Sequence, residues 1–149
     1  MSIIERLNAD LKVAMKSRDT ERLPTLRMAI SAMTYRRIER NGELSEQEQL
    51  DVMRKQVKQR EDSITEFKRG GREDLVAKET RERDILKLYL PAELDAVALR
   101  SAVGEALAPL GAEPQLGAAM KAAMAALKDK ASGKAIQEAV RAVLEKKTS

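Results

Sequence analysis

The run from residue 45 to 67 constrains the fold of this chain more than any other stretch. Ser45 and Glu48 form an S-x-x-E capping box, in which two side chains satisfy free backbone N–H groups at a helix start. Apolar residues then recur at helical spacing, and Arg60 stands at the one step where an apolar residue is missing. The pattern predicts one long helix with Arg60 on its buried stripe. The apolar positions are Leu50, Met53, Val57, Ile64 and Phe67.

The same spacing predicts three further helices before residue 91. The first begins at a second capping box, Ser2 with Glu5. The next one starts near Arg22 with Pro24 in its first turn, and Asn41-Gly42 supplies a left-handed stop. A fourth helix covers about 73–88, after Gly70-Gly71. For the helix after Arg22 we expect this buried face: Leu23, Leu26, Ala29, Ile30, Met33 and Ile38.

Tyr89-Leu90-Pro91 marks the best domain boundary, because proline cannot continue a helix and the residue before it is pushed to extended geometry. Alanine and glycine become more frequent after it. Aromatic residues make up only 2% of the chain, which suits helices better than a β-sandwich. We therefore expect an all-α protein: an N-terminal domain of about four helices (1–91) and a small three-helix domain (92–149). Residues 147–149 are expected to fray.

Two absences limit the chemistry. The sequence contains no cysteine and no histidine, which removes disulfides, the usual zinc sites and the Ser-His-Asp and Cys-His arrangements. We predict no catalytic residue, no metal site and no cofactor. No signal peptide and no apolar run of about 18 residues is present, so we expect no membrane contact and a cytoplasmic location.

The alanine-rich tail carries the main candidate site. Its basic residues surround a tight turn predicted at Ala131-Ser132-Gly133-Lys134, and such a cluster would neutralise phosphates in a salt-dependent way. A net charge of +4 permits a nucleic-acid partner without requiring one. The competing interpretation is a solvated helix face. The candidate RNA-binding residues are Lys121, Lys128, Lys130, Lys134 and Arg141.

A second basic group lies between Lys12 and Arg40, where eight Lys or Arg residues face three acids. We favour a structural role, in which these arginines extend over the bundle or pair with acids of a neighbouring helix. The acids available for pairing are Glu61, Asp62, Glu66, Glu79 and Glu82. Arg60 needs a buried partner, and we expect Glu79, with Asp84 and Asp62 as alternatives. Three scattered aromatics are too few for base stacking, which argues against single-stranded nucleic acid.

Short phrases along the whole chain resemble the GatB/YqeY family, in its stand-alone YqeY-like form. No single phrase is a strong motif, and their order and spacing carry the match. The matching residues are Ile4-Glu5-Arg6-Leu7-Asn8, Met15-Lys16, Glu21-Arg22-Leu23, Leu26-Arg27-Met28, Lys58-Gln59-Arg60-Glu61-Asp62-Ser63, Gly71-Arg72-Glu73-Asp74-Leu75-Val76, Glu79, Tyr89-Leu90-Pro91, Gly117, Met120, Met124, Leu127-Lys128, Ala131, Gly133-Lys134 and Val140.

The resemblance implies an all-helical, two-part protein whose tail is similar to the C-terminal domain of the B subunit of the tRNA-dependent amidotransferase. That enzyme is a carbon–nitrogen ligase with glutamine as amido-N-donor, and its tail domain contacts tRNA while the chemistry lies elsewhere. The chain departs from the family pattern at Ala118, where relatives commonly have lysine, and Lys121 lies one turn along.

The function that follows is a non-catalytic module that binds tRNA or another structured RNA through its tail. The alternative is a protein–protein adaptor that uses its long third and fourth helices, with no nucleic acid. A weaker alternative is an enzyme related to glutamine-dependent ligases, although no P-loop or amidase-like segment is present. The sequence leaves the partner and the oligomeric state open.

Overall fold

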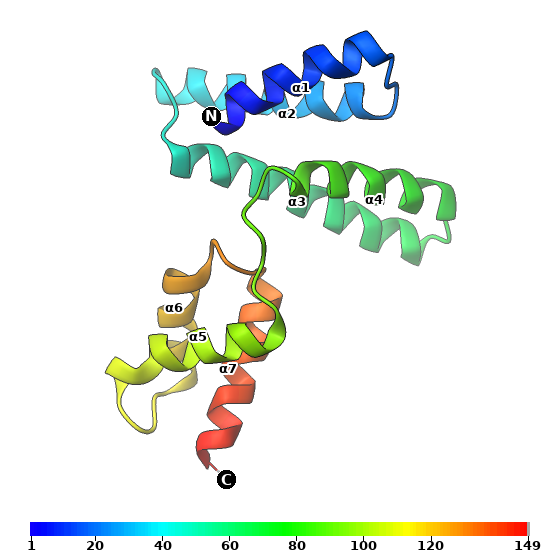
Figure 1. Cartoon of the computed structure of the whole chain (residues 1–149). Helices are drawn as coiled ribbons and strands as arrows, with labels where there is room; N and C mark the ends of the chain where they lie inside the picture. The colour runs from blue at the N-terminus through cyan, green and yellow to red at the C-terminus, as the bar shows by residue number, and fades with distance from the viewer. Residues whose placement is uncertain (149) are drawn as a thin grey trace. The chain divides into compact units, whose positions relative to one another are not determined.

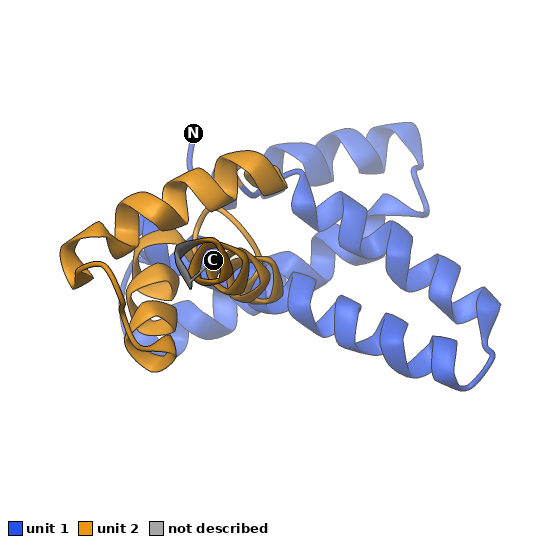
Figure 2. Cartoon of the chain, turned by 90° about the horizontal axis from the view of Figure 1, so that it is seen from below, with its two compact units in different colours: residues 1–90 blue, residues 91–149 orange. Residues whose placement is uncertain are grey.

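The computed structural model describes residues 1–148, and their side chains as far as Lys146. Over these residues the chain contains seven α-helices, one short 3-10 helix and no strand (Figure 1). The predicted all-α class is therefore confirmed. The chain divides into two compact units, Met1–Leu90 and Pro91–Ser149, coloured separately in Figure 2. Each is described by itself below.

Unit 1 consists of two helical hairpins. The first pair of helices pack against each other, as do the last pair, and the second helix contacts both members of the last pair. The core holds Leu7, Leu26 and Met53, which are completely buried. The helices are α1 Ile3–Ser17, α2 Arg22–Arg40, α3 Glu46–Arg69 and α4 Glu73–Lys87.

Side-chain caps explain where these helices begin and end. The Glu48 N–H donates to Ser45 Oγ and the Ser45 N–H donates to Glu48 Oε1, both at 3.1 Å, so the predicted capping box of α3 is confirmed. At α1 the Glu5 N–H also donates to Ser2 Oγ at 3.1 Å. There the serine hydroxyl donates to the Glu5 carboxylate instead of completing the box. Asn41 ends α2 with a left-handed backbone, φ 58°.

One expected core residue of α2 lies on the surface. Ile38 was predicted to be buried, but it is 70% exposed. Met33, the last buried residue of the helix, precedes it by five positions. Five residues rotate a helix about 140° beyond a full turn, so Ile38 cannot share the buried face of Met33. The prediction was wrong because residues on one face of a helix recur every three or four positions, and Ile38 follows Met33 by five.

Unit 2 is a bundle of three helices, and each packs against the other two. Asp95 caps its first helix by accepting a hydrogen bond from the Ala98 N–H at 2.8 Å. The core uses small residues on the middle helix, because Ala119 and Ala123 are completely buried beside Val103 and Ile136. The elements are α5 Ala96–Leu107, η1 Ala108–Leu110, α6 Leu116–Leu127 and α7 Gly133–Thr148. Of the three residues expected to fray, 147 and 148 belong to α7, and Ser149 lies outside the described part of the chain.

Candidate nucleic-acid interface

The turn between α6 and α7 is held by backbone hydrogen bonds. The N–H groups of Lys128 and Lys130 donate to the carbonyls of Met124 and Leu127, at 3.1 and 2.9 Å. The Lys130 carbonyl in turn accepts from the Leu94 N–H at 2.8 Å, which ties the turn to the segment before α5. Hydrogen bonds to the end of α6 and to the segment before α5 therefore hold the turn that carries the predicted basic residues.

Ser132 starts α7. Its hydroxyl oxygen accepts a hydrogen bond from the Ala135 N–H at 3.1 Å, and its carbonyl accepts from Ile136. Gly133 is the first helical residue, and its backbone is not left-handed. A Cβ built there would stand 3.5 Å from the Met124 side chain, an ordinary contact. The turn expected at Gly133 is thus made by residues 128–130 and by the Ser132 cap.

All five predicted RNA-binding residues are exposed, namely Lys121, Lys128, Lys130, Lys134 and Arg141. Among the residues that the structure describes, none of the five forms an ion pair. Lysines without a partner keep their full charge available to a phosphate.

The structure groups four of these residues and sets one apart. Lys128, Lys130 and Lys134 fall within one turn and the start of α7, and Lys121 shares a face of α6 with Lys128 because seven residues make about two turns. Arg141 lies about 10 Å along α7 from Lys134. Glu138 stands between these two on the same face of α7. The basic surface is therefore densest at the α6–α7 turn.

The arginines at the end of α2 form a contrasting group, because acids hold them. Arg40 lies 2.6 Å and Arg36 lies 3.4 Å from Glu48, while Arg37 lies 2.9 Å from Glu43. The hydrogen bond from Arg40 is the main reason that the pKa of Glu48 lies below its ordinary value. The structural role predicted for these three arginines holds. Their partners are Glu48, at the start of the neighbouring α3, and Glu43, in the loop before it, rather than the acids named from the sequence.

Arg60 is buried, as the apolar stripe predicted, with its side chain 7% exposed. Its Nε atom lies 3.9 Å from Glu79, the predicted partner, and 3.4 Å from Glu82, which the sequence did not single out for this role. Burial first, and then the charge of Glu82, raise the pKa of Glu79 above its ordinary value. Two carboxylates from α4 thus share one guanidinium of α3.

Tyr89 forms a buried polar network that was not predicted from the sequence. It is 3% exposed, and its hydroxyl donates to an Asp10 carboxylate oxygen. Arg6 lies over its ring at 4.9 Å from the ring centroid and also donates to the Leu88 carbonyl at 3.1 Å. Burial, followed by the hydrogen bond to Asp10, raises the pKa of Tyr89. Only its place two residues before Pro91 could have drawn attention to it. The network ties the end of unit 1 to α1.

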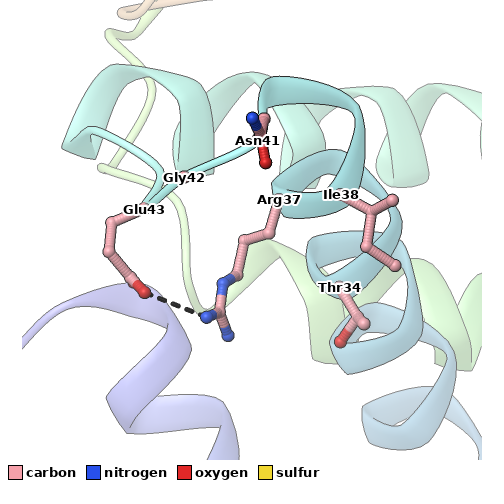
Figure 3. Close-up of a pocket in the computed structure, with 6 residues that line it drawn as sticks. All are labelled: Thr34, Arg37, Ile38, Asn41, Gly42 and Glu43. Atoms are coloured by element: carbon pink, nitrogen blue, oxygen red, sulfur yellow. Dashed lines mark hydrogen bonds and ion pairs between the residues drawn. The ribbon is translucent and has the colours of Figure 1, made fainter.

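A surface hollow of about 430 Å³ lies at the end of α2. Figure 3 shows Thr34 and Ile38 on the helix and Arg37 reaching toward Glu43 across it; Asn41 and Gly42 complete the lining. Over the described residues, acidic side chains form no group of three or more that could hold a metal ion. No helix within that part of the chain is long and apolar enough to span a bilayer.

Comparison with known proteins gives one family and a set of fungal relatives. The model of a family described as Yqey-like protein matches residues 4–144. The relatives carry the name "Altered inheritance of mitochondria protein 41, mitochondrial". The protein of Saccharomyces cerevisiae (strain YJM789) is 33% identical over 135 residues, which is 90% of this chain and 65% of that protein.

Two further relatives match over shorter segments. The protein of Kluyveromyces lactis is 41% identical over 90 residues, which is 60% of this chain and 49% of the relative. That of Lachancea thermotolerans is 38% identical over 101 residues, 62% of this chain and 54% of the relative. The chain thus spans less than two thirds of the length of the curated relatives that it matches.

These relatives correct one prediction. The expected cytoplasmic location is wrong, because the matching curated relatives are named as mitochondrial proteins. The prediction had relied on the lack of a secretory signal and of a membrane-spanning run. Neither absence excludes an organelle, because other targeting signals differ from both patterns.

Proposed function

Because the chain belongs to the YqeY-like protein family, we propose that it is a non-catalytic module that binds tRNA or another structured RNA through unit 2. The observation that carries the proposal is the α6–α7 turn. It presents Lys128, Lys130 and Lys134, all exposed and without ion pairs among the described residues. The relatives' names state a compartment and no activity, so the proposal rests on this chain's own surface.

The chemistry of the contact is phosphate neutralisation. Each phosphate that a lysine neutralises releases counterions, and this lowers the logarithm of the binding constant by about 0.7–0.9 per tenfold rise in salt. Three lysines at one turn therefore predict a slope of about −2 to −3. Scattered aromatics and the absence of a stacking surface favour folded RNA, which proteins recognise by shape and phosphate contacts.

The outer face of α6 suits a backbone-to-backbone approach. Gly117, Ala118 and Ala125 are exposed, and Lys121 is the only charged residue within the helix. A surface of small side chains has little relief, so a phosphodiester chain could lie close to it while Lys121 and Lys128 reach its oxygens. The family resemblance implies a lysine at 118, where this chain has alanine, and Lys121, one turn along, would supply a similar charge.

The link to the tRNA-dependent amidotransferase belongs to this proposal as a shared mode of RNA contact. It assigns no carbon–nitrogen ligase step to this chain, since the resemblance covers only the tail domain of that enzyme's B subunit.

The adaptor alternative receives less support from α3 and α4. The large apolar side chains that are exposed in the described chain lie outside both helices; Leu88, just after α4, comes nearest. A partner surface on α3 and α4 would thus be almost wholly charged and polar.

The test is binding of bulk tRNA across a salt series, measured by fluorescence anisotropy. We expect the triple variant Lys128→Glu, Lys130→Glu, Lys134→Glu to lose binding at least tenfold and to reduce the salt slope by about two to three. The matched control reverses three exposed lysines of unit 1, Lys55→Glu, Lys58→Glu and Lys68→Glu, with the same change in net charge.

Two outcomes would reject the proposal. One is the absence of wild-type binding at low salt. The other is an equal loss in both triple variants, because net charge rather than the turn would then explain binding.

A further inference from the structure

The outer face of α2 carries an uncharged stripe. Pro24, Met28, Ser31, Tyr35 and Ile38 follow one another at spacings of 4, 3, 4 and 3. All five are exposed, and Met28, Tyr35 and Ile38 are 48%, 71% and 70% exposed. We call these five residues the α2 stripe. Its residues lie opposite the buried face of the helix, which includes Leu26, Ala29 and Met33.

This arrangement differs from the other exposed apolar residues. Single surface hydrophobics such as Val13 and Val97 are ordinary in any soluble protein. Five uncharged residues aligned over four turns are not, because the solvent-facing side of a surface helix is normally charged or polar. The 4,3,4,3 spacing is that of a helix that packs along a second helix. The spacing of the α2 stripe therefore favours packing against a second helix.

We propose that the partner is α2 of a second copy of this chain, packed antiparallel about a two-fold axis near Ser31. A two-fold contact must be self-complementary, so that residue i meets residue j and j meets i. The stripe meets this requirement. An axis at Ser31 sets Pro24 against Ile38 of the second copy, and it brings Met28 to within one residue, about 1.5 Å along the helix, of the level of Tyr35. The small serine at the crossing point lets the two helices approach closely.

The edges of the α2 stripe are compatible with this pairing. On one edge lie Arg27 and Thr34, four and three residues from the axis, so that Arg27 of one copy lies nearest to Thr34 of the other and no two arginines meet. On the other edge lie Glu21 and Glu39, and each acid has a cation of its own chain nearby. Arg81 lies 3.9 Å from Glu21, and Arg36 lies 3.9 Å from Glu39.

The same edges argue against other occupants. A strongly acidic helix or an RNA backbone would need unpaired cations along the stripe. Of the cations on α2 that border it, Arg27 is the one that lacks an ion pair within the described residues, and the centre of the stripe carries no charge. The charge pattern thus favours a neutral, self-complementary contact.

The hollow at the end of α2 adds shape complementarity to this contact. It lies beside Ile38 and Thr34, at one end of the stripe (Figure 3). In the antiparallel arrangement the first turn of the second α2, with its exposed Pro24, arrives there. The space of about 430 Å³ would receive that turn.

The expected dimer is weak. Stable complexes bury about 800 Å² on each partner, and one helix face with three large exposed side chains falls short of that area. We therefore expect a monomer in dilute solution and a dimer that forms as the protein concentration rises.

The test uses the absence of native cysteine. A residue on a two-fold axis meets its own copy, and packed helices about 8–10 Å apart bring facing Cα atoms to disulfide distance. Under mild oxidation Ser31→Cys should give a disulfide-linked dimer at least tenfold faster than Ser101→Cys, an exposed serine on α5. Adding Tyr35→Glu or Ile38→Glu to Ser31→Cys should remove this advantage, with the helical circular dichroism unchanged.

Sedimentation equilibrium of the wild-type protein complements the crosslinking. A concentration-dependent shift toward dimer that Tyr35→Glu abolishes supports the proposal. Equal crosslinking at residues 31 and 101, crosslinking at 31 that survives Tyr35→Glu, or a wild-type monomer at every concentration would each overturn it. None of these outcomes involves RNA, so the result is independent of the function proposed for unit 2.

Discussion

The end of α2 and the α6–α7 turn are both clusters of cations, but they differ in what surrounds them. Arg36, Arg37 and Arg40 each lie within 3.4 Å of a glutamate that follows in the chain. Lys128 and Lys130 have no ion pair with any described residue, and backbone hydrogen bonds hold their turn in place. The first cluster uses its charge to join α2 to α3, whereas the second leaves its charge to solvent.

The difference shows why counting charges along a sequence misleads. Lys12 to Arg40 is the stretch with the largest basic excess, but several of its arginines form ion pairs with glutamates of the same chain. The tail has a smaller excess, yet Lys121, Lys128, Lys130 and Lys134 form no ion pair among the described residues. The partners of a cation, rather than the number of cations, decide which surface can attract a phosphate.

The largest expected effect comes from removing one ion-paired cation and, separately, one cation without an ion pair. Replacing Arg60 with methionine leaves the nearly buried Glu79 and Glu82 without their cation. Breaking a buried ion pair from one side costs about 3–5 kcal/mol of unfolding free energy. Lys130→Met, at an exposed and unpaired site, should cost less than about 0.5 kcal/mol. Urea unfolding of both variants measures the difference.

A combined variant checks the cause. Adding Glu79→Gln and Glu82→Gln to Arg60→Met should recover most of the lost stability, because no charge then remains buried. A loss below about 1 kcal/mol for Arg60→Met alone would show that water reaches these carboxylates.

The second comparison uses the two tyrosines of unit 1. Tyr89→Phe removes the hydrogen bond to Asp10 from a residue that is 3% exposed. A hydrogen bond to a charged group contributes about 1.5–3 kcal/mol, and we expect the lower end because Asp10 is only half-buried. Tyr35→Phe, at 71% exposure, is the matched control and should change stability by less than about 0.5 kcal/mol. Equal effects in thermal unfolding would contradict the role given to Tyr89.

The smallest expected effect is a pH dependence that has opposite signs at two glutamates. The pKa of Glu79 is raised, so the folded protein holds its proton more tightly, and its contribution to stability falls as pH rises from about 4.5 through the folded pKa. The pKa of Glu48 is lowered, so its contribution is present above about pH 4.5 and is lost as pH falls through the folded pKa.

Unfolding between pH 3 and 7 tests these signs. Relative to wild type, Glu79→Gln should gain stability as pH rises, and Glu48→Gln should lose it. Parallel curves for the two variants would mean that the buried cluster and the cap do not differ in their protonation.

The boundaries of several helices could be predicted because their signals are local. Ser45 and Glu48 satisfy each other within one turn, and Asn41 takes the left-handed conformation that few residues adopt without strain. The burial of Arg60 could also be predicted, because a residue in line with buried apolar residues on a helix is buried with them. Glu82 was not identified as its partner, because spacing gives a face and does not say which residue of another helix meets it.

For the candidate site, the amino-acid sequence was enough to predict which residues could bind a phosphate: a basic turn in an alanine-rich tail, with no histidine or cysteine to support other chemistry. Which cations are paired with acids became clear only from the packing of the helices, which brings Arg36 and Arg40 to Glu48 and Arg60 to Glu79 and Glu82. The difference is the sequence separation of the residues that interact. Caps and helical periods depend on residues a few positions apart, whereas ion pairs and exposed faces depend on how separate helices meet.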